Sequence, residues 1–269
     1  MPLLRFTSLM AYRTLTLKTE GPLATLRLAR PDRANPIDGT LLDELEHACA
    51  AVNDDPDVRV MLLTAEGEVF SSGWDPAELR PEAFDAAEWR RRREESPPFA
   101  ALESMGQPVI CALNGDARSA GLELALACDV RLAAEGAQFV LPETEQGLLP
   151  MAGGTQRLPR LVGRAHALRL ILLAEPIDAD EALRIGLVSA VFPRDTLLAE
   201  AEALALRMAS RGPVALRYAK EAVRRGLEQP LDQALRFETD LTVILQSTED
   251  RAEGVRAFLE KREPKFKGR

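Results

Sequence analysis

Short, almost wholly apolar runs alternate with segments of helical periodicity through the first two thirds of the chain. The runs VRVMLLTAEG and PVICALNG, which begin at Val58 and Pro108, carry few polar residues. Such runs are typical of strands in a sheet that is covered on both faces. The helical segments between them predict parallel crossovers. The sequence therefore predicts an α/β core.

Two further patterns set the organisation of the chain. The stretch YRTLTLKTEGPLATLRLARP alternates on both sides of Glu20-Gly21, which predicts a β-hairpin. After about residue 155 the pattern is helical, apart from the strand-like run LVSAVF. We therefore predict an α/β core over residues 1–195 and a helical region over 196–269. We expect AQFVLPE to form an edge-like strand, and the residues before Tyr12 to be irregular.

The composition excludes several classes of protein. The net charge of −8 and a pI of about 5.1 argue against a broad nucleic-acid-binding surface. Three widely spaced cysteines and two separate histidines predict buried free thiols and no metal site. No apolar run is long enough to cross a bilayer. Because the first residues are short for a signal peptide, we expect a cytoplasmic protein.

One carboxylate stands in a segment that is otherwise apolar. The stretch SAGLELALACD, from Ser119 to Asp129, carries Glu123 at its centre. A buried carboxylate is costly unless it finds hydrogen-bond partners or shifts its pKa. From these residues alone, a structural hydrogen-bonding role and a catalytic role are equally open.

Six motifs occur in order from about Tyr12 to Gly268: ARPDRANPI, VFSSGWDPAEL, PVICALNGDARSAGLELALACDVRLAAEGAQFVLPE, GLLPMAGGTQRLPRLVG, GLVSAVFP and STEDRAEGVRAFLEKREPKFKG. Together they resemble the crotonase superfamily, the enoyl-CoA hydratase/isomerase family. This resemblance implies a core of repeated ββα units. It also implies a C-terminal helical region that drives homo-trimers, which often pair into hexamers.

The resemblance places the two catalytic glutamates of the family's hydratases on Glu123 and Glu143, with Glu145 as a rival to the second. Water adds across the double bond of an enoyl thioester. One carboxylate takes a proton from water while a carboxyl group supplies one to carbon. We expect an enoyl-CoA hydratase. Double-bond isomerisation, thioester hydrolysis and a catalytically impaired scaffold that binds CoA esters remain alternatives.

The resemblance also implies an oxyanion hole made of the backbone N–H groups of Trp74 and Ala120. Such donors stabilise the negative charge that develops on the thioester oxygen. The chain departs from the family here, because Ser119-Ala120 replaces small glycines and Trp74 replaces a small residue. Arg118 stands where many members have an apolar residue. Met151 replaces the aspartate of dienoyl isomerases and aryl dehalogenases, which disfavours those activities.

Coenzyme A is expected as part of the substrate, with no other cofactor and with neither a nucleic acid nor a membrane as partner. The resemblance places its adenine near two loops, and it places the last helix of a neighbouring subunit against the same CoA. A solvated helix face is the alternative for Lys261. The residues expected to contact CoA are Arg33, Ala34, Asn35, Ile37, Asp75, Pro76, Ala77, Phe258 and Lys261.

Overall fold

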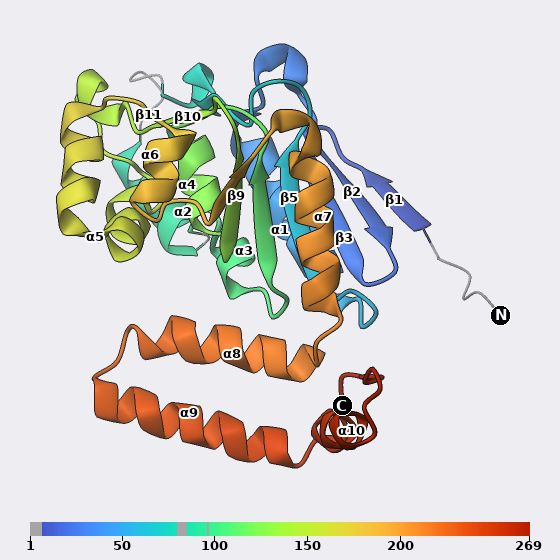
Figure 1. The fold of residues 1–269 in the computed structure, drawn as a ribbon. Coiled ribbons are helices and arrows are strands. Elements are labelled where there is room, and N and C mark those ends of the chain that lie inside the picture. Colours follow the sequence, from blue (N-terminus) through green and yellow to red (C-terminus); the bar gives the residue numbers. More distant parts are fainter. Residues whose placement is uncertain (1–6, 80–84, 96) are drawn as a thin grey trace.

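The computed structural model describes residues 7–79, 85–95 and 97–269 and is built around a seven-stranded sheet (Figure 1). The first three strands are antiparallel and the following ones pair in parallel. The predicted α/β class is therefore confirmed. In spatial order the strands are β1 (Thr7–Ala11), β2 (Leu15–Glu20), β3 (Leu23–Leu28), β5 (Val60–Ala65), β7 (Val109–Leu113), β9 (Val130–Ala134) and β12 (Ala190–Phe192).

The predicted hairpin is confirmed, but the prediction of an irregular N-terminus is wrong for residues 7–11. Strands β2 and β3 pair from Leu15↔Leu28 to Glu20↔Leu23 around Gly21, whose φ is +58°. Strand β1 pairs antiparallel with the free edge of β2. An edge strand leaves a row of unpaired backbone groups, and a short preceding segment can satisfy them.

Alternate residues of the parallel strands face two different cores, as expected for a sheet covered on both sides. Val60 and Leu62 pack with helix α7 (Arg194–Ala209) on one face. Met61 and Leu63 belong to the larger core on the other face. Because both faces are buried, the strand has no polar alternation, and the prediction from VRVMLLTAEG is confirmed.

The larger core is completed by helices that follow the strands. Helix α1 (Gly39–Asp54) is capped by Asp38, whose Oδ1 accepts a hydrogen bond from Leu41 N at 2.9 Å. The other helices before α7 are α2 (Ala86–Glu95), α3 (Ala100–Ser104), α4 (Ala120–Leu126), α5 (Gly154–Leu173, with non-helical backbone at Gly163) and α6 (Ala179–Arg184). Two of these helices, α2 and α3, lie on either side of the prolines at residues 97–98.

Two small sheets lie beside the main one. Strand β10 (Gln138–Val140) lies between β8 (Ala117–Arg118) and β11 (Ile177–Asp178), so the prediction of an edge strand is wrong. Both partners of β10 have only two residues, which is too short to leave a periodic signal in the sequence. Strands β4 (Pro36–Ile37) and β6 (Gly73–Trp74) form a parallel pair.

The last three helices, α8 (Pro213–Gly226), α9 (Leu231–Gln246) and α10 (Glu249–Leu259), lie beyond one end of the sheet (Figure 1). An ion pair of 2.7 Å joins Lys220 of α8 to Asp129. Helix α7, by contrast, packs on the sheet. The division of the chain into two regions at residue 195 stays a prediction. Large apolar side chains are exposed along the last three helices: Val223, Leu227, Leu231, Leu235, Val243, Ile244, Val255, Phe258 and Leu259.

Candidate active site

Glu123 lies in α4, the helix that follows β7 and β8, and its side chain is 0% exposed. Its Oε1 accepts hydrogen bonds from two backbone N–H groups, those of Ala152 at 2.8 Å and Gly154 at 2.7 Å. Its Oε2 has no hydrogen-bond partner among the described residues. One oxygen is therefore held in place, while the hydrogen-bonding capacity of the other is unused within the described chain.

Burial raises the pKa of Glu123 to about 7, and the nearby charge of Glu143 acts in the same direction. The two backbone hydrogen bonds favour the ionised form and oppose this rise. A carboxyl with a pKa near neutrality can both release and accept a proton under physiological conditions, which is what general acid–base catalysis requires.

Glu143 begins a short 3-10 helix, η4 (Glu143–Gln146), directly after Pro142, and is 4% exposed. Neither carboxylate oxygen has a hydrogen bond of normal geometry in the part of the chain that the structure describes. Burial raises the pKa of Glu143, although the nearby Ser119 hydroxyl works in the opposite direction. Glu145, the rival position, is exposed.

A pocket of about 330 Å³ is lined by Glu143 and Trp74, whereas Glu123 and Ala120 are not among its lining residues. Trp74 contributes to its wall, so the indole bounds the space where an acyl group would lie. Arg118 and Met151, two of the positions that depart from the family pattern, line the same pocket. The lining residues are Ser72, Trp74, Pro76, Leu79, Arg118, Ser119, Pro142, Glu143, Gln146, Leu148 and Met151.

The backbones of Trp74 and Ala120 are brought close together by β6 and the start of α4. The approach is tight, since a Cβ added at Gly73, whose φ is +92°, would lie 2.5 Å from the Cβ of Ser119. Ala120 is the first residue of α4, so its N–H has no partner within the helix. No other backbone group of the described chain accepts a hydrogen bond from it.

The two loops predicted to contact CoA lie side by side. Arg33 and Asp75 form an ion pair of 2.7 Å, and the N–H of Asp75 donates to the carbonyl of Ile37 at 2.8 Å. Asp75 also accepts a hydrogen bond from the N–H of Ala77 at 3.0 Å. The pairing of β4 with β6 therefore gives these loops a common, fixed geometry.

Two of the predicted CoA contacts have side chains that face the protein interior. Ile37 is buried, and the amide of Asn35 donates to the carbonyls of Glu66 and Val69, each at 2.9 Å. Asn35 thus holds the loop in shape.

Phe258 and Lys261 are not brought to the pocket within one chain. Phe258 is 82% exposed at the end of α10, and α10 lies at the opposite end of the molecule from α4 and β10 (Figure 1). Both residues are available to a neighbouring molecule.

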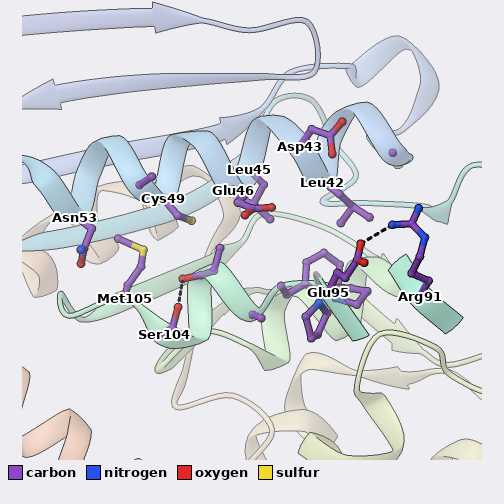
Figure 2. Close-up of a pocket in the computed structure, with 17 residues that line it drawn as sticks. Leu42, Asp43, Leu45, Glu46, Cys49, Asn53, Arg91, Glu95, Ser104 and Met105 are labelled. Atoms are coloured by element: carbon purple, nitrogen blue, oxygen red, sulfur yellow. Dashed lines mark hydrogen bonds and ion pairs between the residues drawn. The ribbon is translucent and has the colours of Figure 1, made fainter. Parts of the chain in front are cut away.

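A larger pocket of about 800 Å³ opens between α1 and α3 (Figure 2). Its wall includes Leu42 and Leu45 of α1, and Arg91 joined to Glu95 by an ion pair of 2.6 Å. None of the predicted site residues lines it. The smaller pocket is the better candidate for the active site, because it is lined by the buried carboxyl of Glu143 and by Trp74, two of the predicted site residues.

The sequence analysis missed the two backbone donors to Glu123. Ala152 and Gly154 lie in the motif MAGGTQ, at the start of α5. A Cβ added at Gly154 would lie 2.9 Å from Oε1 of Glu123, so this position requires a residue without a side chain. The pair of glycines in the motif was the available signal for a close backbone approach.

Among the described residues, no group of three or more His, Cys, Asp or Glu side chains is placed to hold a metal ion. The three cysteines, Cys49, Cys111 and Cys128, are buried and unpaired, as the sequence predicts. No helix in the described part of the chain has the length and apolar character needed to span a membrane.

Two buried carboxyls that interact electrostatically, one of them lining a pocket in an α/β core, are typical of an enzyme that uses general acid–base chemistry. The sequence model of the enoyl-CoA hydratase/isomerase family matches residues 18–269, and the chain belongs to this family. It is 41% identical to the crotonyl-CoA hydratase of Syntrophomonas wolfei over 96% of this chain and 99% of that protein. It is 43% identical to the 2,3-dehydroadipyl-CoA hydratase of Escherichia coli over 91% and 94%.

A solved structure of an enoyl-CoA hydratase from Bacillus anthracis has the same fold. The TM-score is 0.87 at 38% sequence identity, and the alignment covers 98% of this chain and 99% of that one. This likeness confirms the predicted crotonase-like core with its helical C-terminal part.

Proposed function

We propose that the protein is an enoyl-CoA hydratase, a carbon–oxygen lyase that adds water across the 2,3 double bond of an enoyl-CoA thioester. The observation that carries this proposal is the buried pair of Glu123 and Glu143. Glu123 has one oxygen fixed by two N–H donors and one oxygen without a partner among the described residues. That arrangement suits a group that exchanges a proton with a bound water molecule.

The pair acts as one unit that carries a single proton. A water molecule between the carboxyls loses a proton to the ionised partner while its oxygen bonds to C3 of the enoyl group. The electrons of the double bond move to the thioester as an enolate, and the protonated partner supplies the proton to C2. Because the two groups are coupled, the apparent pKa values that a rate profile reports belong to the pair.

The enolate oxygen is stabilised by the N–H groups of Trp74 and Ala120. Each such donor is worth roughly 2.7–4 kcal/mol where a comparable oxyanion hole is disrupted. Ala120 adds the favourable dipole of a helix N-terminus, although α4 is short. The CoA moiety lies along the loops from Arg33 to Ile37 and from Asp75 to Ala77.

The exposed apolar side chains of α8 to α10 are covered by further copies of the chain in a homo-trimer or hexamer. In this arrangement Phe258 and Lys261 of one subunit contact the CoA bound to its neighbour. No cofactor besides the CoA of the substrate takes part, and the enzyme works in the cytoplasm without a nucleic acid or a membrane as partner.

The proposal is tested by following the loss of the enoyl-thioester absorbance of crotonyl-CoA. Glu123→Gln and Glu143→Gln are each expected to lower kcat by about 10²–10⁴, the range for general acid–base groups. The double variant should lose less than the product of the two effects, because the groups act as a unit. Full activity in either single variant contradicts the role of that residue. Tight binding of CoA esters without turnover in the wild type would indicate a scaffold.

A further inference from the structure

Ser119 has a backbone conformation that side-chain-bearing residues rarely adopt. Its φ is +51° and its ψ is −130°. This combination is populated readily by glycine alone, since a Cβ clashes with the backbone there. A serine at this position therefore costs free energy, and such strain persists only where surrounding structure enforces it.

The surrounding structure fixes Ser119 from both sides. Its N–H donates to the carbonyl of Val140 in β10 at 2.9 Å, and its carbonyl accepts from the N–H of Glu123 at 3.1 Å. These two bonds join the residue to β10 and to α4. The side chain consequently has a defined direction rather than the freedom of a loop residue.

The side chain lies against Gly73, beside the pocket. The Cβ of Ser119 occupies the space beside Gly73, where an added Cβ would lie 2.5 Å from it and 3.0 Å from its Oγ. Ser119 also lines the pocket of about 330 Å³ that contains Glu143. Ser119 therefore borders both Gly73 and the pocket that contains Glu143.

Glu143 is the group in this pocket that needs a donor. Its two oxygens are buried and have no hydrogen bond of normal geometry among the described residues. Burial raises the pKa of this carboxyl, and the Ser119 hydroxyl is the side chain that works in the opposite direction. A hydroxyl that donates to an ionised carboxylate forms one of the stronger types of hydrogen bond.

We infer that Ser119 is a positioning residue, whose Oγ–H donates to the carboxylate of Glu143, fixes its direction toward the bound water and favours its ionised form. The strained backbone is the cost of placing this hydroxyl where the family's usual glycine offers none. The inference rests on the proposed function, because it assigns Ser119 a task in the same proton transfer.

Other charges near Glu143 do not depend on Ser119. Glu123 of α4 repels its anion, and Arg118 of β8 lines the same pocket. Arg157 of α5 acts on Glu123, and Glu145 is exposed on the same 3-10 helix. Since all four remain when Ser119 is replaced, a change in the pH profile reports the hydroxyl itself.

Two variants separate the hydroxyl from the backbone. Ser119→Ala removes Oγ and keeps the strained Cβ, whereas Ser119→Gly removes both. Profiles of kcat/KM against pH are measured with crotonyl-CoA, together with thermal unfolding. We expect the acid limb of the kcat/KM profile to move to higher pH by a similar amount in both variants, because the hydroxyl that favours ionised Glu143 is gone. We expect kcat at neutral pH to fall about 10-fold, the effect of one hydrogen bond. Only Ser119→Gly should raise Tm, because glycine adopts this backbone without strain.

A control replaces a hydroxyl outside the pocket. Ser104 on α3 is exposed and donates to the carbonyl of Ala101 at 3.2 Å, so Ser104→Ala should leave the profile unchanged. The inference is overturned if neither Ser119 variant moves the acid limb. It is also overturned if kcat falls equally at every pH, which indicates a contact with the substrate, or if only the glycine variant changes activity.

The activity of Glu143→Gln, measured in the same assay, distinguishes failure of the proposed hydratase function from failure of the proposed role of Ser119. If this variant is fully active, the proposed function fails. If it is inactive while Ser119→Ala retains the wild-type pH profile, the proposed function stands and the role of Ser119 is refuted.

Discussion

The backbone nitrogen of Gly154 lies 2.7 Å from Oε1 of Glu123, so the first residue of α5 holds the central carboxyl of α4. The same oxygen accepts from Ala152, which leaves Oε2 as the oxygen without a partner among the described residues. The direction of Oε2 is therefore set by the backbone of a different helix, and not by the rotamer of Glu123 alone.

We predict that Gly154→Ala lowers kcat by about 10–100-fold, because the added Cβ would lie 2.9 Å from Oε1 and push the carboxyl out of place. A displacement of about 1 Å in a catalytic group can cost 10²-fold in rate. The measurement is steady-state hydration of crotonyl-CoA. Gly39→Ala is the control, since a Cβ there meets nothing within 4 Å and activity should stay the same. An unchanged kcat in Gly154→Ala would show that the hydrogen bond does not orient Glu123.

A second prediction concerns the dependence of stability on pH. Burial raises the pKa of folded Glu123 to about 7 from an ordinary 4.5, so the folded chain keeps a proton that the unfolded chain releases. This contribution is complete below pH 4.5 and is lost as the pH rises through 7. Glu123→Gln removes the titrating group, and its amide oxygen can still accept from both N–H donors.

The free energy of unfolding of Glu123→Gln, relative to wild type, should therefore increase by up to roughly 3 kcal/mol between pH 4.5 and pH 8. Urea denaturation at several pH values measures it. Glu145→Gln changes an exposed carboxylate and should give a curve parallel to wild type. If the Glu123→Gln curve is also parallel, Glu123 is not a buried acid with a raised pKa.

The sequence predicted much of this fold and only part of the site. Apolar runs such as Val60–Ala65 were informative because their burial on two faces removes polar alternation. The two-residue strands β8 and β11 were not predictable, since they are too short to show a period. In the site, the motif around Glu123 predicted which carboxyl is buried. Its donors were missed because backbone N–H groups carry no side-chain signature.

The proposed CoA contact by a neighbouring subunit gives a third prediction. Lys261→Ala should raise KM for crotonyl-CoA while kcat stays near the wild-type value, because the residue binds a phosphate and takes no part in the chemistry. A charge-assisted hydrogen bond is worth about 1.5–3 kcal/mol, or roughly 10–150-fold in KM. Lys265→Ala removes another exposed lysine four residues later and should leave KM unchanged. Equal values of KM for both variants and wild type would make Lys261 a solvated charge.

Oligomerisation is the subject of a fourth prediction. Leu231, at the start of α9, is 75% exposed in the single chain. If a second copy covers it, Leu231→Asp places a charge in an apolar interface and should shift the particle from trimer or hexamer toward monomer. Light scattering after size exclusion measures this. Glu200→Lys, on the exposed side of α7, should leave the mass unchanged. A Leu231→Asp protein that keeps the wild-type mass would place this residue outside the interface.

Trp74 supplies the last prediction, because its backbone and its side chain have separate roles. The indole lines the pocket of about 330 Å³, whereas the N–H is the proposed oxyanion donor. Trp74→Ala keeps the donor and widens the pocket, so activity on longer or branched enoyl-CoAs should rise relative to crotonyl-CoA. The comparison is kcat/KM over a series of acyl lengths. Loss of a buried tryptophan costs about 3–5 kcal/mol of stability, so circular dichroism must first show a folded protein. In a folded variant, complete loss of turnover on every substrate would show that the indole positions the thioester and does more than bound the pocket.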